Sequence, residues 1–422
     1  GSSTSSASGT SAVSQSSTST ASAADVSESQ TESTSVSEST AESESTSEAT
    51  AESSTSGSDT ASADGFATTD DVSDAPDITG ITIESKMVLN YAECFNVYYC
   101  TDGYKLLDVK DGAQYLLVPD GKEAPDDLDS DVIVIHQPLE RIYMAATSPM
   151  ALFDAIDSLD TIRLSGETAD NWYVQDAVDA MNAGTMIFAG KYSEPDYETL
   201  VNGECDLAVE STMILHTPKV QEMIEDLDIP VFVDYSSYES HPLGRTEWIK
   251  LYGAMLNKED AADSFFEKQA QVIEKLKGFE NTEKTVAYFY VNTDGSIVVR
   301  KSEDYIPSMI EIAGGRYAFK NLKNVDSNAP SVKLTMEEFY ATAVDADYLI
   351  YNGTIDGQVK SISDLEAKSN LFSEFKAVKE GNVWYTGKNL YQATDTVGEL
   401  IMDMHLMLTD GDPKEMTFLE KM

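Results

Sequence analysis

The first 78 residues constrain this chain more than any other feature, because their composition cannot build a packed core. They contain no Lys or Arg, 39 of them are Ser or Thr, 14 are Asp or Glu, and Phe66 is the only aromatic residue. Such a segment buries too little apolar surface to offset the entropy lost on ordering. We therefore predict a disordered tether over residues 1–78, typical of a tethered extracellular protein.

The remaining 344 residues are enough for two lobes of ordinary domain size. Fourteen of the 74 acidic residues lie in the tether, which leaves 60 against 28 basic residues in the body. This balance argues against nucleic acid or an anionic membrane surface as a partner, since both attract basic surfaces. No apolar run in the body approaches the roughly 20 residues of a membrane span.

Residues 79–140 alternate apolar and polar side chains between turn signals. Asp102-Gly103 and Asp111-Gly112 separate alternating runs, and Asp-Gly between such runs predicts hairpins. We therefore predict an N-terminal β-meander ahead of the main body.

From Arg141 onward, short apolar strands alternate with helix-length segments. This alternation predicts an α/β fold with mostly parallel sheets flanked by helices. We expect two lobes, an N-terminal α/β lobe over residues 141–258 and a C-terminal α/β lobe over residues 278–422. A long connecting helix over residues 259–277 joins them, after a break at Asn257-Lys258.

Catalytic signatures are absent from the sequence. There is no G-x-S-x-G, no Walker loop, no H-E-x-x-H and no dinucleotide-binding glycine pattern after a strand. No two of the four histidines lie at metal-ligand spacing. We therefore expect no enzyme activity, no intrinsic cofactor and no protein metal site.

Aromatic, Met and charged residues instead gather at predicted strand ends, where open α/β sheets usually bind ligands. The mixture suits a large planar or amphipathic ligand, because aromatic area provides contact and a few donors fix orientation. Core packing is the alternative for Trp172 and Trp384. Gap filling is the alternative for Met213, and loop anchoring for His241. The candidate ligand-binding residues are Trp172, Tyr173, Tyr192, Met213, His216, Tyr238, His241, Arg245, Arg300, Tyr305, Trp384 and Tyr391.

The segment Ser240–Gly253 (SHPLGRTEWIKLYG), the Ala-Gly-Gly step at 313–315 and the repeated βα pattern resemble one known family. It is the family of substrate-binding proteins of ABC importers for iron complexes and cobalamin, in the periplasmic-binding-protein class with a helical connector. The resemblance spans roughly residues 141–408. It implies two α/β lobes with a ligand cleft between them, joined by a helix that maps to Glu259–Leu276, and limited closure on ligand binding.

The resemblance also implies a lipid anchor and a docking mode. In Gram-positive bacteria such proteins resemble lipoproteins, held at the extracellular face of the membrane by a lipidated Cys, which would lie just before Gly1. The first residues lack the features of a signal peptide, so the chain reads as a mature sequence. The family docks through one acidic residue on each lobe, which pairs with transporter arginines. Matching steps place them at Glu198 and Glu337, although both could be solvated charges at helix starts.

These observations support one leading hypothesis. The chain is an extracellular, lipid-anchored, monomeric solute-binding component of an ABC importer that delivers a metal chelate to a permease dimer. A ferric siderophore is the first choice, since Arg300, with Arg245 and Lys301, could grip an anionic chelate. The alternatives are haem or a corrinoid, although no second-lobe His stands where a haem ligand is expected. A surface sensor or adhesin with the same fold is the competing class.

Overall fold

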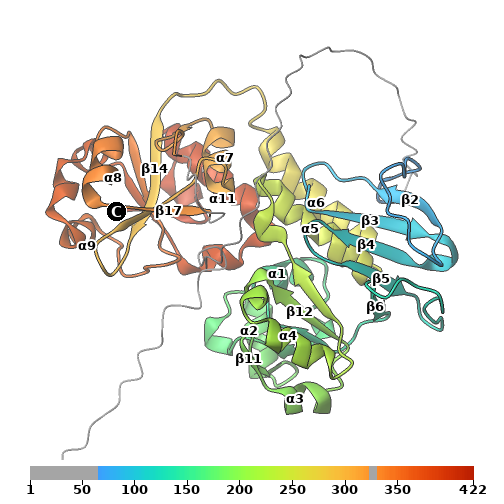
Figure 1. Cartoon of the computed structure of the whole chain (residues 1–422). Coiled ribbons are helices and arrows are strands. Elements are labelled where there is room, and N and C mark those ends of the chain that lie inside the picture. Colours follow the sequence, from blue (N-terminus) through green and yellow to red (C-terminus); the bar gives the residue numbers. More distant parts are fainter. Residues whose placement is uncertain (1–64, 323–329) are drawn as a thin grey trace, which may run out of the picture.

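The computed structural model describes residues 65–322 and 330–422 (Figure 1). Its N-terminal part is a six-stranded sheet, the lead-in sheet, whose strands follow one another in chain order. The ladders are antiparallel from β1 to β5, as a meander requires, but β5 and β6 run parallel. A parallel pair needs a crossover of a dozen or more residues, and the connection over 119–132 provides it. The strands are β1 Thr68–Thr69, β2 Ile83–Met87, β3 Phe95–Cys100, β4 Lys105–Val109, β5 Gln114–Val118 and β6 Ile133–His136.

The predicted tether extends too far toward the C-terminus, because the chain joins the fold well before residue 78. β1 pairs with β2, the ring of Phe66 lies 5.3 Å from that of Tyr99, and Ile78 is buried. Composition missed this segment because the neighbouring sheet provides its apolar partners. Residues 1–64 of the predicted tether lie outside the described residues.

The N-terminal lobe contains a five-stranded sheet of order β13-β12-β7-β8-β9, parallel throughout. Every residue of β13 is buried, as expected for a parallel strand covered on both faces. The strands are β7 Ile142–Met144, β8 Ile162–Ser165, β9 Ile187–Phe188, β12 Leu207–Ser211 and β13 Val231–Asp234, with a small hairpin of β10 Gly190–Lys191 and β11 Glu194–Pro195. The helices are α1 Ser148–Ala155, α2 Gln175–Asn182, α3 Tyr197–Asn202 and α4 Pro218–Glu225.

Two consecutive helices connect the lobes. They are α5 Pro242–Met255 and α6 Glu259–Glu274, and the predicted break between them is confirmed at Asn257, whose φ is 57°. The lead-in sheet lies on one side of this connector, where β3 contacts α5, and α11 of the second lobe contacts α6 on the other (Figure 1).

The C-terminal lobe is built on a sheet of order β17-β15-β14-β18-β19-β20, with β16 beside β14. Its centre is parallel and its outer pairs are antiparallel. The strands are β14 Thr285–Val291, β15 Ile297–Arg300, β16 Arg316–Tyr317, β17 Ser331–Leu334, β18 Tyr348–Tyr351, β19 Val383–Thr386 and β20 Leu419–Lys421. The helices are α7 Tyr305–Ala313, α8 Met336–Ala343, α9 Ile362–Lys368, α10 Lys376–Glu380 and α11 Val397–Leu408. The predicted two-lobed α/β fold is confirmed.

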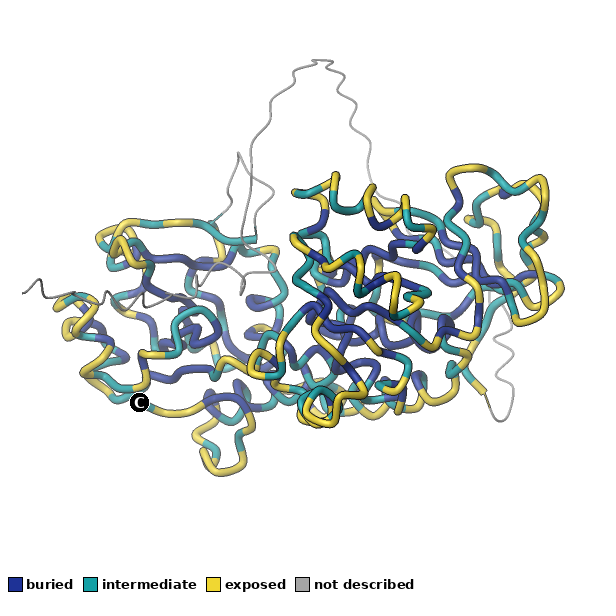
Figure 2. The backbone as a smooth tube through the Cα atoms, turned by 90° about the horizontal axis from the view of Figure 1, so that it is seen from below, coloured by how far each residue is buried: buried dark blue, intermediate teal, exposed yellow. Residues whose placement is uncertain are grey.

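Buried residues run through the interior of both halves of the molecule (Figure 2). One core joins the inner face of the lead-in sheet, the N-terminal lobe and the connector. A second core lies within the C-terminal lobe, and a small third one covers the outer face of the lead-in sheet. The lead-in sheet is therefore an integral part of the first lobe. Among the described helices, none combines the length and the apolar character that a bilayer crossing requires.

Candidate functional site

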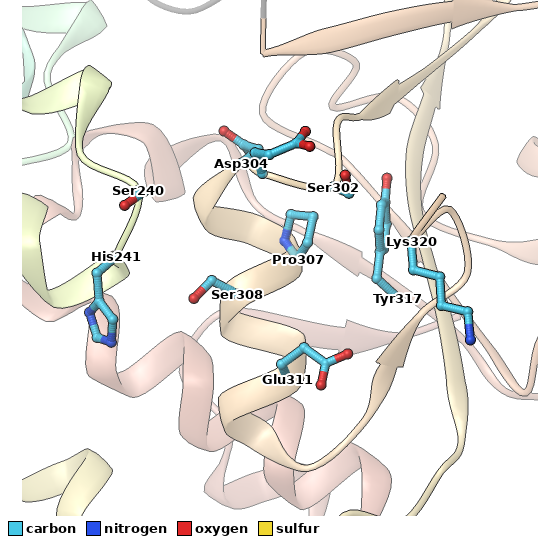
Figure 3. Close-up of a pocket in the computed structure, with 10 residues that line it drawn as sticks. Ser240, His241, Ser302, Asp304, Pro307, Ser308, Glu311, Tyr317 and Lys320 are labelled. Carbon is cyan, nitrogen blue, oxygen red and sulfur yellow. The ribbon is translucent and has the colours of Figure 1, made fainter. Parts of the chain in front are cut away.

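Two cavities flank the first turns of α7, where the C-terminal lobe meets the N-terminal lobe. The larger has a volume of about 390 Å³, within the range of small-molecule sites, and Figure 3 shows its walls. Residues of both lobes line it. They are Ser240 and His241 from the first lobe, and Ser302, Glu303, Asp304, Pro307, Ser308, Glu311, Tyr317 and Lys320 from the second.

The side chain of His241 is held at the edge of this cavity by contacts within the first lobe. It directly precedes α5, and its Nδ1 accepts the backbone N–H of Leu243 at 3.1 Å. Its ring lies 4.6 Å from that of Tyr91, a residue of the segment between β2 and β3. Burial lowers the pKa of His241, which favours the neutral ring. Since Nδ1 is an acceptor, the ring proton lies on Nε2 and is available as a donor.

The opposite wall is one face of α7. Asp304 caps this helix by accepting the N–H of Ile306 and also lies 3.7 Å from the guanidinium of Arg300. Glu311, two turns along, pairs with Arg316. Two of the three acidic side chains at the cavity are thus already neutralised within the lobe. Lys320 offsets the remaining acid, Glu303, so the cavity offers hydroxyl groups, one ammonium group and one imidazole donor without a strong net charge.

The smaller cavity lies on the other side of α7 and has a volume of about 30 Å³, roughly the space of one water molecule. Arg245 of α5 lines it, with its guanidinium carbon 4.2 Å from the centre of the Tyr305 ring. Tyr391 also lines it, and the ring of Tyr391 meets that of Tyr173 edge-on at 6.1 Å. Rings and a cation from both lobes therefore converge here.

Residues 388–399 of the second lobe lie directly against the first lobe, and we call this contact the inter-lobe seam. It includes the 3₁₀ turns η8 Lys388–Gln392 and η9 Thr394–Thr396. Gln392 accepts the N–H of Tyr173 at 2.7 Å and donates to the carbonyl of Asn171 at 2.7 Å. Thr394 donates to the carbonyl of Ser148 and accepts from Thr246. These hydrogen bonds join the two lobes directly.

Comparison with known proteins identifies this architecture. The model of the family described as periplasmic binding protein matches residues 142–390, more than half of the chain. The chain belongs to the periplasmic binding protein family. Its members are binding proteins rather than enzymes, as the absence of catalytic motifs predicts.

Relatives and solved structures agree with this assignment. An uncharacterized lipoprotein of Methanocaldococcus jannaschii is 27% identical over 357 residues, which cover 76% of this chain and 81% of the relative. A possible iron-binding periplasmic solute-binding protein from Staphylococcus epidermidis superposes with a TM-score of 0.51 at 16% identity, covering 64% of this chain and 98% of that one. A periplasmic haem-binding protein of Vibrio cholerae gives 0.51 at 15% identity, covering 65% and 97%. These structures share the fold.

Of the twelve candidate ligand residues of this binding protein, only four lie at the seam, and a fifth lines the larger cavity. Tyr173, Arg245, Tyr305 and Tyr391 meet at the seam, and His241 lines the larger cavity. Arg300, the favoured arginine, is buried beside Asp304. Its side chain therefore supports the start of α7 from within the lobe, with its guanidinium carbon 5.9 Å from the centre of the Tyr305 ring.

The other candidates lie outside both cavities. Trp172 is buried and donates to Ser165 at 2.9 Å. Trp384 is buried in β19, and Tyr238 is 59% exposed and stacks on Tyr235. The remaining three are in the first lobe: half-buried Tyr192 and Met213, and exposed His216.

The two docking candidates are both exposed in the first turn of a helix. Glu198 follows Asp196, whose side chain caps α3. Glu337 precedes Glu338, which forms a capping box with Thr335 at the start of α8. The cap therefore uses Glu338 and leaves Glu337 facing solvent. Their docking role stays a prediction.

Sequence reasoning missed most of the seam. Gln392 and Thr394 contact residues more than 140 positions away, and no local pattern marks such partners. Asp304 could have been found, because an Asp directly before an apolar helix is a capping signal. Among the described residues, no group of three or more His, Cys, Asp or Glu side chains is placed to hold a metal ion.

Proposed function

We propose that this protein captures a metal chelate, with a ferric siderophore as first candidate, between its lobes at the start of α7. The observation that carries the proposal is the meeting of Arg245 with Tyr305 across the seam, beside Tyr391. A cation and aromatic rings supplied by opposite lobes suit an anionic chelate with planar metal-binding groups. Binding would require the lobes to part, since the cavity at the seam holds about 30 Å³.

The proposed grip uses Arg245 in place of Arg300. Arg245 is half-buried and packs on a tyrosine ring, so an incoming anion could take the place of that ring contact. Arg300 would have to leave a buried position beside Asp304, which costs the pairing of a buried charge. Hydroxyl groups of the larger cavity and the Nε2 donor of His241 would contact the polar periphery of the chelate.

Ligand binding is tested by titrating the purified full chain with a ferric hydroxamate, a ferric catecholate, haemin and cyanocobalamin. Calorimetry and quenching of protein fluorescence report binding, and the visible spectrum reports a Soret shift. We expect one ferric siderophore to bind, and Arg245→Gln and Tyr305→Leu each to weaken binding at least about tenfold, equivalent to about 1.4 kcal/mol. Arg163→Gln, at an exposed arginine of β8, is the control and should bind like the wild type.

The same titration separates the alternatives. A Soret shift with haemin and no response to siderophores would replace the siderophore with haem. Binding of cyanocobalamin alone would assign a corrinoid. No binding of any chelate would reject the proposal.

We further propose that the protein is lipid-anchored outside the cell and delivers its ligand to the permease of an ABC importer through Glu198 and Glu337. Both are exposed, and the Methanocaldococcus relatives carry the name lipoprotein. The test is uptake of the radiolabelled chelate in cells that express Glu198→Ala/Glu337→Ala. Uptake should be lost while the purified variant binds normally. If uptake persists, docking does not use these residues, and a protein that never supports uptake would be a sensor or adhesin.

A further inference from the structure

Tyr91, which lies between β2 and β3 of the lead-in sheet, reaches the candidate site through His241. Its ring lies 4.6 Å from the imidazole of His241, with a tilt of 32° between the two planes. His241 in turn lines the larger cavity opposite α7 (Figure 3). The model of the periplasmic binding protein family matches residues 142–390, so Tyr91 lies outside the matched part of the chain. The lead-in sheet therefore adds a contact to the site.

The backbone around Tyr91 is tied to the helix that begins directly after His241. The N–H groups of residues 90–92 donate to the carboxylate of Glu247 on α5 at 2.7–2.8 Å. A Cβ atom on Gly244, in the first turn of α5, would lie 3.2 Å from the carbonyl oxygen of Tyr91, so the segment approaches the helix closely. The same helix thus fixes both Tyr91 and His241.

The ring of Tyr91 is also supported by α6. The ring of Phe266, which is fully buried, meets it edge-on with 6.1 Å between the centroids. A ring that is packed between two helices has little freedom to move. It therefore restricts the rotation of the imidazole against which it lies.

The orientation of this imidazole decides what His241 offers to a ligand. Its Nδ1 accepts the N–H of Leu243 at 3.1 Å, which places the ring proton on Nε2. Rotation of the ring about its bond to Cβ would break this hydrogen bond and move Nδ1 away from Leu243. The neutral ring would then carry its proton on either nitrogen, and the donor at Nε2 would no longer be fixed.

We infer that Tyr91 is a positioning residue, which holds His241 so that Nε2 donates a hydrogen bond to an oxygen atom of the bound chelate. The carboxylate and metal-binding oxygens of a siderophore are acceptors of this kind. The inference rests on the proposed function, because it names the group of the ligand that His241 recognises. The orientation of His241 itself is measured without ligand.

The orientation is tested by nuclear magnetic resonance of the full chain with nitrogen-15 in its histidines, at pH 7. The two nitrogen shifts of an imidazole distinguish its tautomers, and the signals of His241 are those absent from His241→Phe. We expect the Nε2–H tautomer in the wild type and in Tyr91→Phe, which keeps the ring, and a mixture of tautomers in Tyr91→Ala. Tyr104→Ala, at a half-buried tyrosine on the outer face of the lead-in sheet, is the control and should leave the signals of His241 unchanged.

The role in binding is tested by a double-mutant cycle with the ferric hydroxamate and the ferric catecholate. Tyr91→Ala and His241→Phe should each raise the Kd about fivefold, the effect of one lost hydrogen bond. The double variant should also raise it only about fivefold, because Tyr91 acts through His241. Tyr91→Phe should restore wild-type binding, and circular dichroism establishes that each variant is folded.

Two results would overturn the inference. One is an unchanged Nε2–H tautomer in Tyr91→Ala. The other is a double variant whose Kd rises about 25-fold, since the two changes would then act independently. If neither siderophore binds but Tyr91→Ala alters the tautomer, the proposed ligand is rejected and the positioning of His241 by Tyr91 is supported.

Discussion

The connector between the lobes is held from two sides, and the two contacts differ in how their buried polar groups are satisfied. On the side of the lead-in sheet, Glu247 accepts the N–H groups of Asn90, Tyr91 and Ala92 at 2.7–2.8 Å and lies 3.2 Å from Lys250. Glu239 accepts from two more backbone groups there and from the indole of Trp248. Buried carboxylates with this many donors are fully compensated.

The inter-lobe seam has the opposite character. Its polar contacts between the lobes are few and lie mainly at Gln392 and Thr394. This difference in the number of hydrogen bonds indicates which of the two contacts is permanent. A sheet tied to the connector by buried, paired charges should open only on global unfolding, whereas the seam can open locally at low cost.

The largest expected effect comes from breaking the permanent contact. Glu247→Ala leaves three part-buried N–H groups without their acceptor and removes one carboxylate partner of buried Lys250. We expect a loss of about 3–5 kcal/mol in the free energy of unfolding, measured by urea denaturation. Glu267→Ala, at an exposed position of α6, is the control and should change stability by less than about 0.5 kcal/mol. A loss below about 1 kcal/mol in Glu247→Ala would contradict a permanent contact.

Glu210, a carboxyl group inside the N-terminal lobe, lacks in the described part of the chain the hydrogen-bond donors that Glu247 has. Glu210 in β12 is as fully buried as Glu247, but neither of its oxygens has a hydrogen-bond partner among the described residues. Burial raises its pKa well above the usual 4.5. In the unfolded chain the group ionises above about pH 4.5, whereas in the fold it stays neutral. Stability is therefore lost as the pH rises from 4.5 toward the folded pKa, by about 1.4 kcal/mol per pH unit.

Glu210→Met should accordingly stabilise the protein, because it replaces the carboxyl with an apolar group of similar length. We expect a gain of about 2–3 kcal/mol at pH 7 that shrinks toward pH 4.5, measured by denaturation across this range. Glu222→Met, on the exposed face of α4, should show no such pH dependence. A destabilised Glu210→Met protein at pH 7 would mean that the carboxylate is compensated.

Sequence patterns predict what depends on neighbours in the chain. The break in the helical segment at Asn257 follows from the local sequence and agrees with the structure. β8, by contrast, alternates apolar and polar residues but is only four residues long, which is too short for the alternation to mark it. The contacts of Glu239 and Glu247 with the lead-in sheet could not be predicted either, since their backbone donors lie 145–157 residues away.

The residues of the candidate site show the same limit of sequence-based prediction. Residue types at strand ends predict Arg245, Tyr305 and Tyr391, since a cleft between α/β lobes must lie there. Composition cannot distinguish Arg245, which reaches the seam, from Arg300, which is buried within its lobe beside Asp304. That choice depends on the direction in which each side chain leaves its element, and only the packed structure fixes it.

The smallest expected effect tests the reversible contact itself. Gln392→Ala removes the acceptor of the Tyr173 N–H and the donor to Asn171. Since both lobes keep their cores, the free energy of unfolding should fall by less than about 2 kcal/mol, the net value of two hydrogen bonds. Hydrogen exchange at the Tyr173 amide should nevertheless accelerate about fivefold, because exchange there requires only seam opening. Gln221→Ala, which removes a bond within α4, should leave that amide unchanged. Unchanged exchange in Gln392→Ala would mean that the seam is closed by other contacts, and the contrast with the lead-in sheet would then no longer rest on Gln392.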